Sequence, residues 1–251
     1  MNDTRAKLSS GSAEVDSVQT PHHADHTPSR ALTMVRRLDV RRLAIVLGAL
    51  ALGLGGMGVV RALVKSRTGW SIPFFGLDTE WSAPAFFTGG VLVSAAAVYL
   101  LAARKGVFEQ VSGRAVAGLG LFLAYMGIDE VVQLHERMER AFDRGWQSLY
   151  LPLVALGGLA WALCVKGRWP TPLARPCLLA AAGAWVTAQG LERIQRQDGV
   201  LVNRWSILPE EMLEMAGSVL FLVGALVAIQ AGLRHREASP AAPDGSGGGQ
   251  S

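Results

Sequence analysis

The sequence predicts an all-α membrane protein, a six-helix transmembrane bundle with disordered N- and C-terminal tails. Half of the 251 residues are hydrophobic and only 18% are charged, whereas about a quarter of residues are charged in soluble domains. The charged residues cluster and leave long apolar runs, each near the ~20 residues that a helix needs to cross hydrocarbon. The runs are rich in small residues, which favour close helix packing in lipid.

The transmembrane bundle is expected over residues 39–236. Residues 1–38 are polar and lack hydrophobic periodicity, so they are expected to form a disordered tail. The Gly-, Ser- and Pro-rich residues 237–251 are expected to form a second one. The six predicted spans are approximately residues 43–64, 84–103, 115–136, 147–165, 176–194 and 210–233.

Small residues within the runs and aromatic residues at their ends are typical of membrane spans. The first, second and fifth spans contain the runs GALALGLGGMG, VSAAAVYLLAA and LLAAAGAWVTAQG. Pro209 suits the first turn of the sixth helix. Aromatic residues near the span ends are expected to form a belt at the membrane surface. They are Trp70, Trp81, Trp146, Tyr150, Trp169 and Trp205.

The third span is unusual because its apolar run is too short. After Arg114 the run ends at Ile128, and about 20 residues are reached only by including Asp129 and Glu130. A carboxylate below the interface is costly and tends to face the bundle interior or a water-filled cavity. Near the negative end of its helix it is disfavoured further. Both carboxylates therefore need partners.

Arg and Lys residues set the predicted orientation. More of them flank the span ends on the side that contains both chain ends, so the positive-inside rule places both termini in the cytoplasm. The ends of the third and fifth spans and the start of the sixth then share the extracytoplasmic side. Acidic residues occur at all three positions.

These acidic residues form a candidate cation site. In one continuous helix Asp129 and Glu136 lie on the same face, almost two turns apart, and Glu214 lies one turn inside the sixth span. Asp129, Glu136 and Glu214 are the predicted metal ligands. Glu130, His135, Glu192 and Glu211 are second candidates; Glu210 and Glu211 are also explained by the positive end of the helix dipole.

The ligand types suit a divalent metal ion such as Mn, Fe, Mg or Ca, with Zn a further option. No H-E-x-x-H, G-x-S-x-G or phosphate-binding glycine loop is present. No catalytic residue or organic cofactor is identified, and whether the protein is an enzyme is left open. The basic residues follow membrane topology, so the lipid bilayer is the expected partner and nucleic acid is not.

Three functional classes remain open. The first binds or relays a cation or protons through the buried carboxylates. The second is a structural or accessory subunit, with a membrane-protein partner or as a homo-oligomer, whose acids pair with Arg61, Arg137 or Arg193. The third is an enzyme that modifies a lipid or small molecule at the outer leaflet, with a Glu or His135 as general acid or base.

The pair of motifs D-E-x-x-x-x-H-E (residues 129–136) and E-E-x-x-E-M-x-G (residues 210–217) resembles a pattern in uncharacterised bacterial multi-pass membrane proteins. The resemblance covers the third to sixth spans. It implies a helical bundle in the inner membrane and no particular activity.

Overall fold

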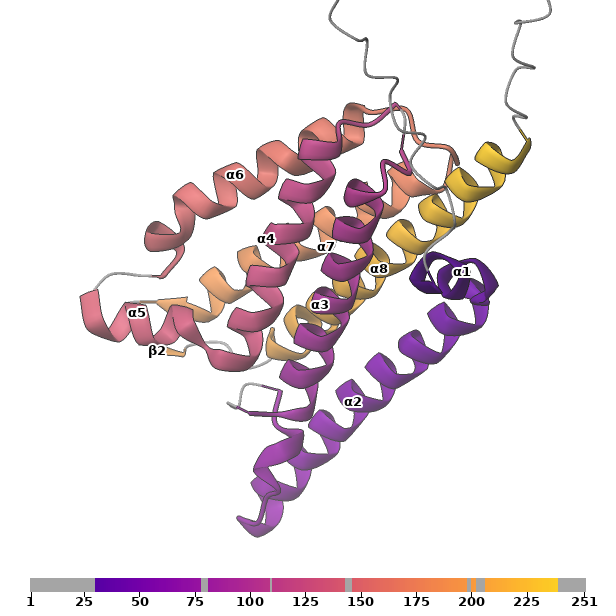
Figure 1. The fold of residues 1–251 in the computed structure, drawn as a ribbon. Coiled ribbons are helices and arrows are strands. Elements are labelled where there is room, and N and C mark those ends of the chain that lie inside the picture. Colours follow the sequence, from indigo (N-terminus) through magenta and orange to yellow (C-terminus); the bar gives the residue numbers. More distant parts are fainter. Residues whose placement is uncertain are drawn as a thin grey trace, which may run out of the picture.

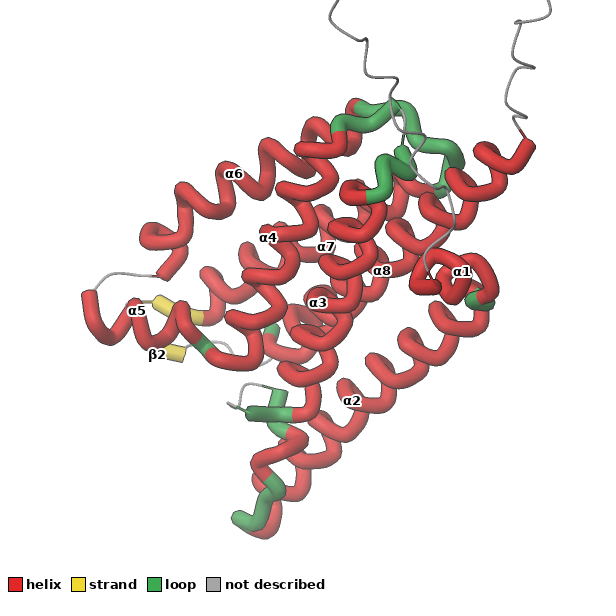
Figure 2. Tube along the Cα trace, viewed as in Figure 1, coloured by secondary structure: helices red, strands yellow, loops and turns green. Residues whose placement is uncertain are grey.

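The computed structural model describes residues 30–77, 81–108, 110–142, 146–197, 200–201 and 206–238, and nearly all of them are helical (Figures 1 and 2). The helices are α1 (Arg30–Arg37), α2 (Val40–Thr68), the 3-10 turn η1 (Pro73–Phe75), α3 (Ala83–Arg104), α4 (Gly113–Val132), α5 (Leu134–Phe142), α6 (Trp146–Lys166), α7 (Ala174–Gln195) and α8 (Ile207–Ala238). A short antiparallel strand pair, β1 (Arg196–Gln197) and β2 (Val200–Leu201), lies between α7 and α8.

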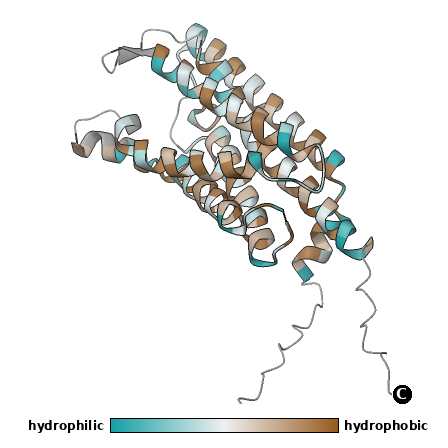
Figure 3. Ribbon diagram, turned by 90° about the horizontal axis from the view of Figure 1, so that it is seen from above, coloured by the Kyte–Doolittle hydropathy of each residue, from teal (hydrophilic) through white to brown (hydrophobic). Residues whose placement is uncertain are grey.

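Five helices of the described chain are long and apolar enough to cross a membrane. They are α2, α3, α4, α6 and α8. Helix α7 covers the predicted fifth span at 22 residues, but it is less apolar than these five. Hydrophobic residues recur along the helices (Figure 3), and α2 exposes large apolar side chains such as Leu52, which is 68% exposed. These features confirm a membrane protein with several apolar spans.

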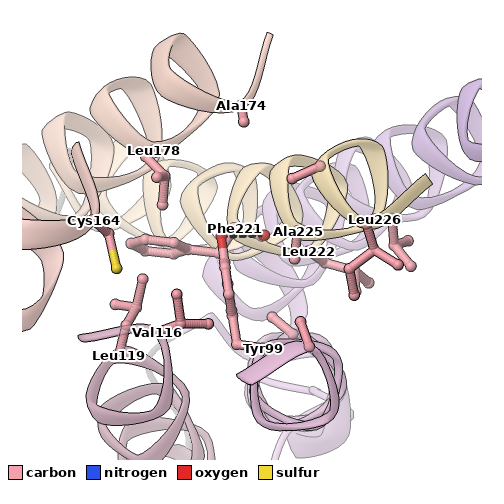
Figure 4. Packing of buried hydrophobic residues seen from close by; sticks show 14 of the residues in the cluster. Tyr99, Val116, Leu119, Cys164, Ala174, Leu178, Phe221, Leu222, Ala225 and Leu226 are labelled. Carbon is pink, nitrogen blue, oxygen red and sulfur yellow. Dashed lines mark hydrogen bonds between the residues drawn. The ribbon is translucent and has the colours of Figure 1, made fainter. Parts of the chain in front are cut away.

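Helix α8 is the most buried of the five candidate spans. It packs against α7, α3 and α2, while α3 also packs against α4. In the core, Tyr99 of α3 donates a hydrogen bond to the backbone oxygen of Phe221 in α8 (3.4 Å). Leu119 of α4, Cys164 of α6 and Leu178 of α7 lie beside this pair (Figure 4). Helices from across the sequence therefore share one core.

Glycines let two helix pairs approach closely. A Cβ atom added at Gly89 of α3 would lie 2.6 Å from the backbone oxygen of Gly127 in α4, and one at Gly127 would lie 2.8 Å from the oxygen of Gly89. Between α7 and α8, a Cβ at Gly217 would lie 2.5 Å from Cδ1 of Trp185. These contacts confirm the close packing that the small residues predict.

The third predicted span, residues 115–136, is wrong at its C-terminal end. Helix α4 ends at Val132, and Gln133 adopts a left-handed conformation with φ 55° and ψ 48°. Helix α5 starts at Leu134 and turns away from the α4 axis (Figure 1). Asp129 and Glu136 therefore do not share the face of one helix.

The predicted N-terminal tail is also too long. Residues 30–37 form α1, with Leu32 buried. Gln230 of α8 donates hydrogen bonds to the backbone oxygens of Val35 (3.0 Å) and Leu38 (2.7 Å). Tertiary contacts with α8 thus order a segment whose composition alone predicts disorder. The rest of both predicted tails, residues 1–29 and 239–251, lies outside the described residues.

The glycine contact between α3 and α4 makes a prediction about stability. Gly89→Ala places a methyl group against the backbone of Gly127, so the helices must separate, and we expect a loss of about 1–3 kcal/mol in the free energy of unfolding. Gly90→Ala is the matched control, because a Cβ there meets nothing within 4 Å. Denaturation of the purified protein in detergent measures both. Equal effects of the two substitutions would contradict the contact.

Candidate functional site

Asp129 lies at the end of α4 and is only 5% exposed. Its Oδ1 accepts a hydrogen bond from the hydroxyl of Tyr150 in α6 and another from the backbone N–H of His135, both at 2.9 Å. Its Oδ2 lies 2.8 Å from Nδ1 of His135. The buried carboxylate thus has three partners from the two helices that follow it.

These contacts explain the turn between α4 and α5. Asp129 is four residues from Gln133, whose backbone N–H donates to the Asp129 carbonyl at 2.6 Å. The carboxylate meanwhile accepts the N–H of His135 in the first turn of α5, where helix N–H groups lack partners and negative charge is favoured. The side chain that is disfavoured at the end of α4 is therefore stabilised by the start of α5.

His135 and Tyr150 both bond Asp129 directly, which the sequence does not indicate. We assign the proton of the histidine ring to Nδ1, because the facing oxygen belongs to a carboxylate, which accepts hydrogen bonds. Tyr150 was expected in the aromatic belt, and that expectation is wrong: its side chain is 2% exposed and bonds Asp129. Its ring also contacts that of Tyr125, with ring centroids 5.6 Å apart.

Glu130, the neighbour of Asp129, lies against α3. A Cβ added at Gly89 of α3 would lie 3.6 Å from the Cβ of Glu130, so the base of this side chain lies against the glycine contact. Glu130 makes no hydrogen bond or ion pair with any residue that the structure describes. Its interactions with neighbouring charges act through space.

Glu214 of α8 is 8% exposed and has one side-chain hydrogen bond within the described chain. Gln189 of α7 donates this bond from Nε2 to Oε1 of Glu214 at 3.2 Å. The contact of Gly217 with Trp185 lies one turn away on both helices, so the close packing of α7 and α8 brings Gln189 to the carboxylate. Gln189 was not identified from the sequence, because an amide in an apolar helix carries no recognisable ligand spacing.

The structure brings together acidic residues from α4, α7 and α8. Glu130 lies within electrostatic range of Asp129, His135, Glu192 and Glu210. Glu214 lies within range of Glu130 and of three further acids: Glu192, Glu210 and Glu211. We call Glu130, Glu192, Glu210, Glu211 and Glu214 the carboxylate cluster. Its members come from the three helix ends at which the sequence predicts convergence.

The predicted metal ligands are not assembled as one group. Asp129 bonds His135 and Tyr150, whereas Glu214 bonds Gln189 and lies within electrostatic range of Glu130. Glu136 falls in α5, and its side chain lies outside the described part of the structure. Among the described residues, no three His, Cys, Asp or Glu side chains are placed to hold a metal ion. The assignment of these residues as metal ligands stays a prediction.

Neither Glu130 nor Glu214 forms an ion pair with an arginine of the described chain. Arg61 of α2, one of the predicted partners, has a buried Nε atom without a hydrogen-bond partner among these residues. Salt bridges to arginine therefore do not account for these two carboxylates within the described chain.

The chain matches a known protein family. The model of a protein family described as a domain of unknown function, DUF8692, matches residues 42–229. The match runs from α2 into α8 and includes Asp129, His135, Tyr150 and the carboxylate cluster. No curated protein and no solved structure matches the chain. Since the family model covers most of the sequence, this chain belongs to the DUF8692 family.

Proposed function

We propose that this protein is a six-span bundle of a bacterial inner membrane whose carboxylate cluster binds and relays protons. The observation that carries the proposal is the position of Glu130 and Glu214. These two carboxyl side chains come from separate helices and lie within electrostatic range of each other, and neither has an arginine partner within the described chain.

Energetic cost favours protons as the ligand. A buried carboxylate without compensation is expensive, and such groups in membranes pair, bind an ion or take up a proton. Within the described chain neither Glu130 nor Glu214 pairs with a lysine or arginine, and the described residues form no group suited to a metal. Proton uptake neutralises either carboxyl without any further ligand, and two neighbouring carboxyls can share a proton.

Asp129, His135 and Tyr150 extend the proposed relay. Glu130 follows Asp129 directly in the chain and lies within electrostatic range of His135. The imidazole has a proton on Nδ1 toward Asp129 and can exchange another at Nε2, as histidine does in proton shuttles. The Tyr150 hydroxyl holds the other carboxylate oxygen. These groups connect α5 and α6 to the carboxylate cluster.

The proposed orientation places the cluster on the extracytoplasmic side. Both described chain ends, α1 and the end of α8, lie at the opposite end of the bundle, where Arg and Lys residues are more frequent. The positive-inside rule then places these ends in the cytoplasm. In this arrangement α7 also crosses the membrane, as the fifth of six spans. The resemblance to bacterial multi-pass proteins supports an inner membrane.

The relay predicts that Glu130 and Glu214 exchange protons. In infrared difference spectra between low and high pH, Glu130→Gln and Glu214→Gln should each lose part of the carboxyl signal that wild type shows. Glu237→Gln is the matched control, because Glu237 is exposed and pairs with Arg36 at 2.5 Å. Buried-carboxyl signals that are identical in wild type and both cluster variants would contradict the proposal.

The bond between Tyr150 and Asp129 predicts a loss of stability on removal of the hydroxyl. We expect Tyr150→Phe to lower the free energy of unfolding by about 1.5–3 kcal/mol, as for hydrogen bonds to charged groups. Tyr99→Phe is the control, since Tyr99 donates a longer bond to a neutral carbonyl, and about 0.5–1.5 kcal/mol is expected there. A Tyr150→Phe protein as stable as wild type would show that the bond does not hold Asp129.

Proton binding also predicts the metal content. Elemental analysis of the purified protein should find no divalent metal in stoichiometric amount, and chelator treatment should leave thermal stability unchanged. The contradicting result is one metal ion per chain that disappears in Asp129→Asn or Glu214→Gln but persists in the control Asp39→Asn. It would show that the cluster binds a metal cation and not protons.

A further inference from the structure

A second polar site lies at the other end of α8. A cavity of about 200 Å³ is bounded by the loop between α3 and α4, the loop between α6 and α7, and the last turns of α8. From Glu214 to Gly232 the α8 axis rises by about 27 Å at 1.5 Å per residue. This cavity therefore lies on the opposite side of the bundle from the carboxylate cluster.

The floor of the cavity is apolar. Val107 and Phe108 are buried, and the Phe108 and Trp169 rings meet edge to face with centroids 4.8 Å apart. The Trp169 indole N–H donates to the backbone oxygen of Cys164 at 2.8 Å. A Cβ added at Gly232 would lie 2.9 Å from Cγ1 of Val107. The glycine thus lets the loop approach α8 closely and shapes the floor.

The rim of the cavity carries two arginine side chains and one histidine. Arg168, His235 and Arg236 line it, and all three are exposed. Arg236 donates from its guanidinium to the backbone oxygens of Lys105 and Gly106, which fixes its position. The Arg168 side chain forms no hydrogen bond with the described residues. Gln110 adds an amide, and Glu109, the residue between Phe108 and Gln110, lies outside the described residues.

No described carboxylate lines this cavity. Glu237, the next residue after Arg236, pairs with Arg36 of α1 instead. The described lining therefore has two guanidinium groups and an imidazole around an apolar and aromatic floor. A ligand that matches it has an anionic group and an adjoining less polar part.

We infer that this cavity binds the phosphate group of an anionic phospholipid headgroup. It lies at the ends of the apolar helices α3, α6 and α8, which is the depth of the headgroups in a spanned bilayer. Basic pockets between membrane helices bind phosphate-containing headgroups, and arginine suits phosphate through paired N–H donors. The volume of about 200 Å³ is many times the ~10–15 Å³ that a cavity needs for one water, so the cavity has room for a phosphate group.

Native mass spectrometry of the full chain in detergent tests this site. The protein is titrated with phosphatidylglycerol and, as the zwitterionic comparison, with phosphatidylcholine of the same acyl chains. Wild type should bind phosphatidylglycerol more tightly. Arg168→Gln should weaken that binding by about fivefold, which is the contribution of one arginine to binding at an anionic membrane surface. Because Arg168 is exposed, the substitution should not disturb folding.

Arg234→Gln is the matched control, since Arg234 is exposed at the same end of α8 and does not line the cavity. It should bind phosphatidylglycerol like wild type. A third arm adds inorganic phosphate. Binding of free phosphate that depends on Arg168, without a preference for phosphatidylglycerol, would overturn the lipid as the source. Phosphatidylglycerol binding that is equal in wild type and Arg168→Gln would overturn the site itself.

Discussion

Close contact between helix backbones at glycine is the constraint on which the carboxylate cluster depends. Gly89 and Gly127 let α3 meet α4, and Gly217 lets α8 meet Trp185 of α7. The first contact places the base of Glu130 against α3, which itself packs on α8. The second brings Gln189 to Glu214. In lipid, where apolar burial between helices provides little driving force, such contacts are a main source of association.

The adjacent carboxyls of Asp129 and Glu130 have different surroundings. Both lie in the last turn of α4, just before the chain turns into α5. Asp129 is held by the start of α5 and by Tyr150, so its charge is well compensated. Glu130 has no such bond within the described chain. It lies within electrostatic range of Glu214, which accepts one side-chain hydrogen bond, from the Gln189 amide. Asp129 links the end of α4 to α5 and α6. Glu130 belongs to the carboxylate cluster, which we propose exchanges protons. Folding and the proposed function therefore use neighbouring residues.

Much of the fold follows from apolar run length. The predicted spans 43–64, 84–103, 147–165 and 210–233 each lie within one helix of the structure, because a long apolar run has one stable conformation in lipid. The end of α4 could not be predicted, since Gln133 gives no sign of its left-handed conformation.

The convergence of acids at three helix ends was predicted from topology alone. The bonds of Asp129 were not, because α5 and Tyr150 approach it through the tertiary fold. A double-mutant cycle with Glu130→Gln and Glu214→Gln tests the central claim most directly. Unfolding free energies should show a coupling of about 0.5–3 kcal/mol, as expected for residues in one network. Effects that add within about 0.5 kcal/mol would show that the two carboxyls act independently, and would contradict the account.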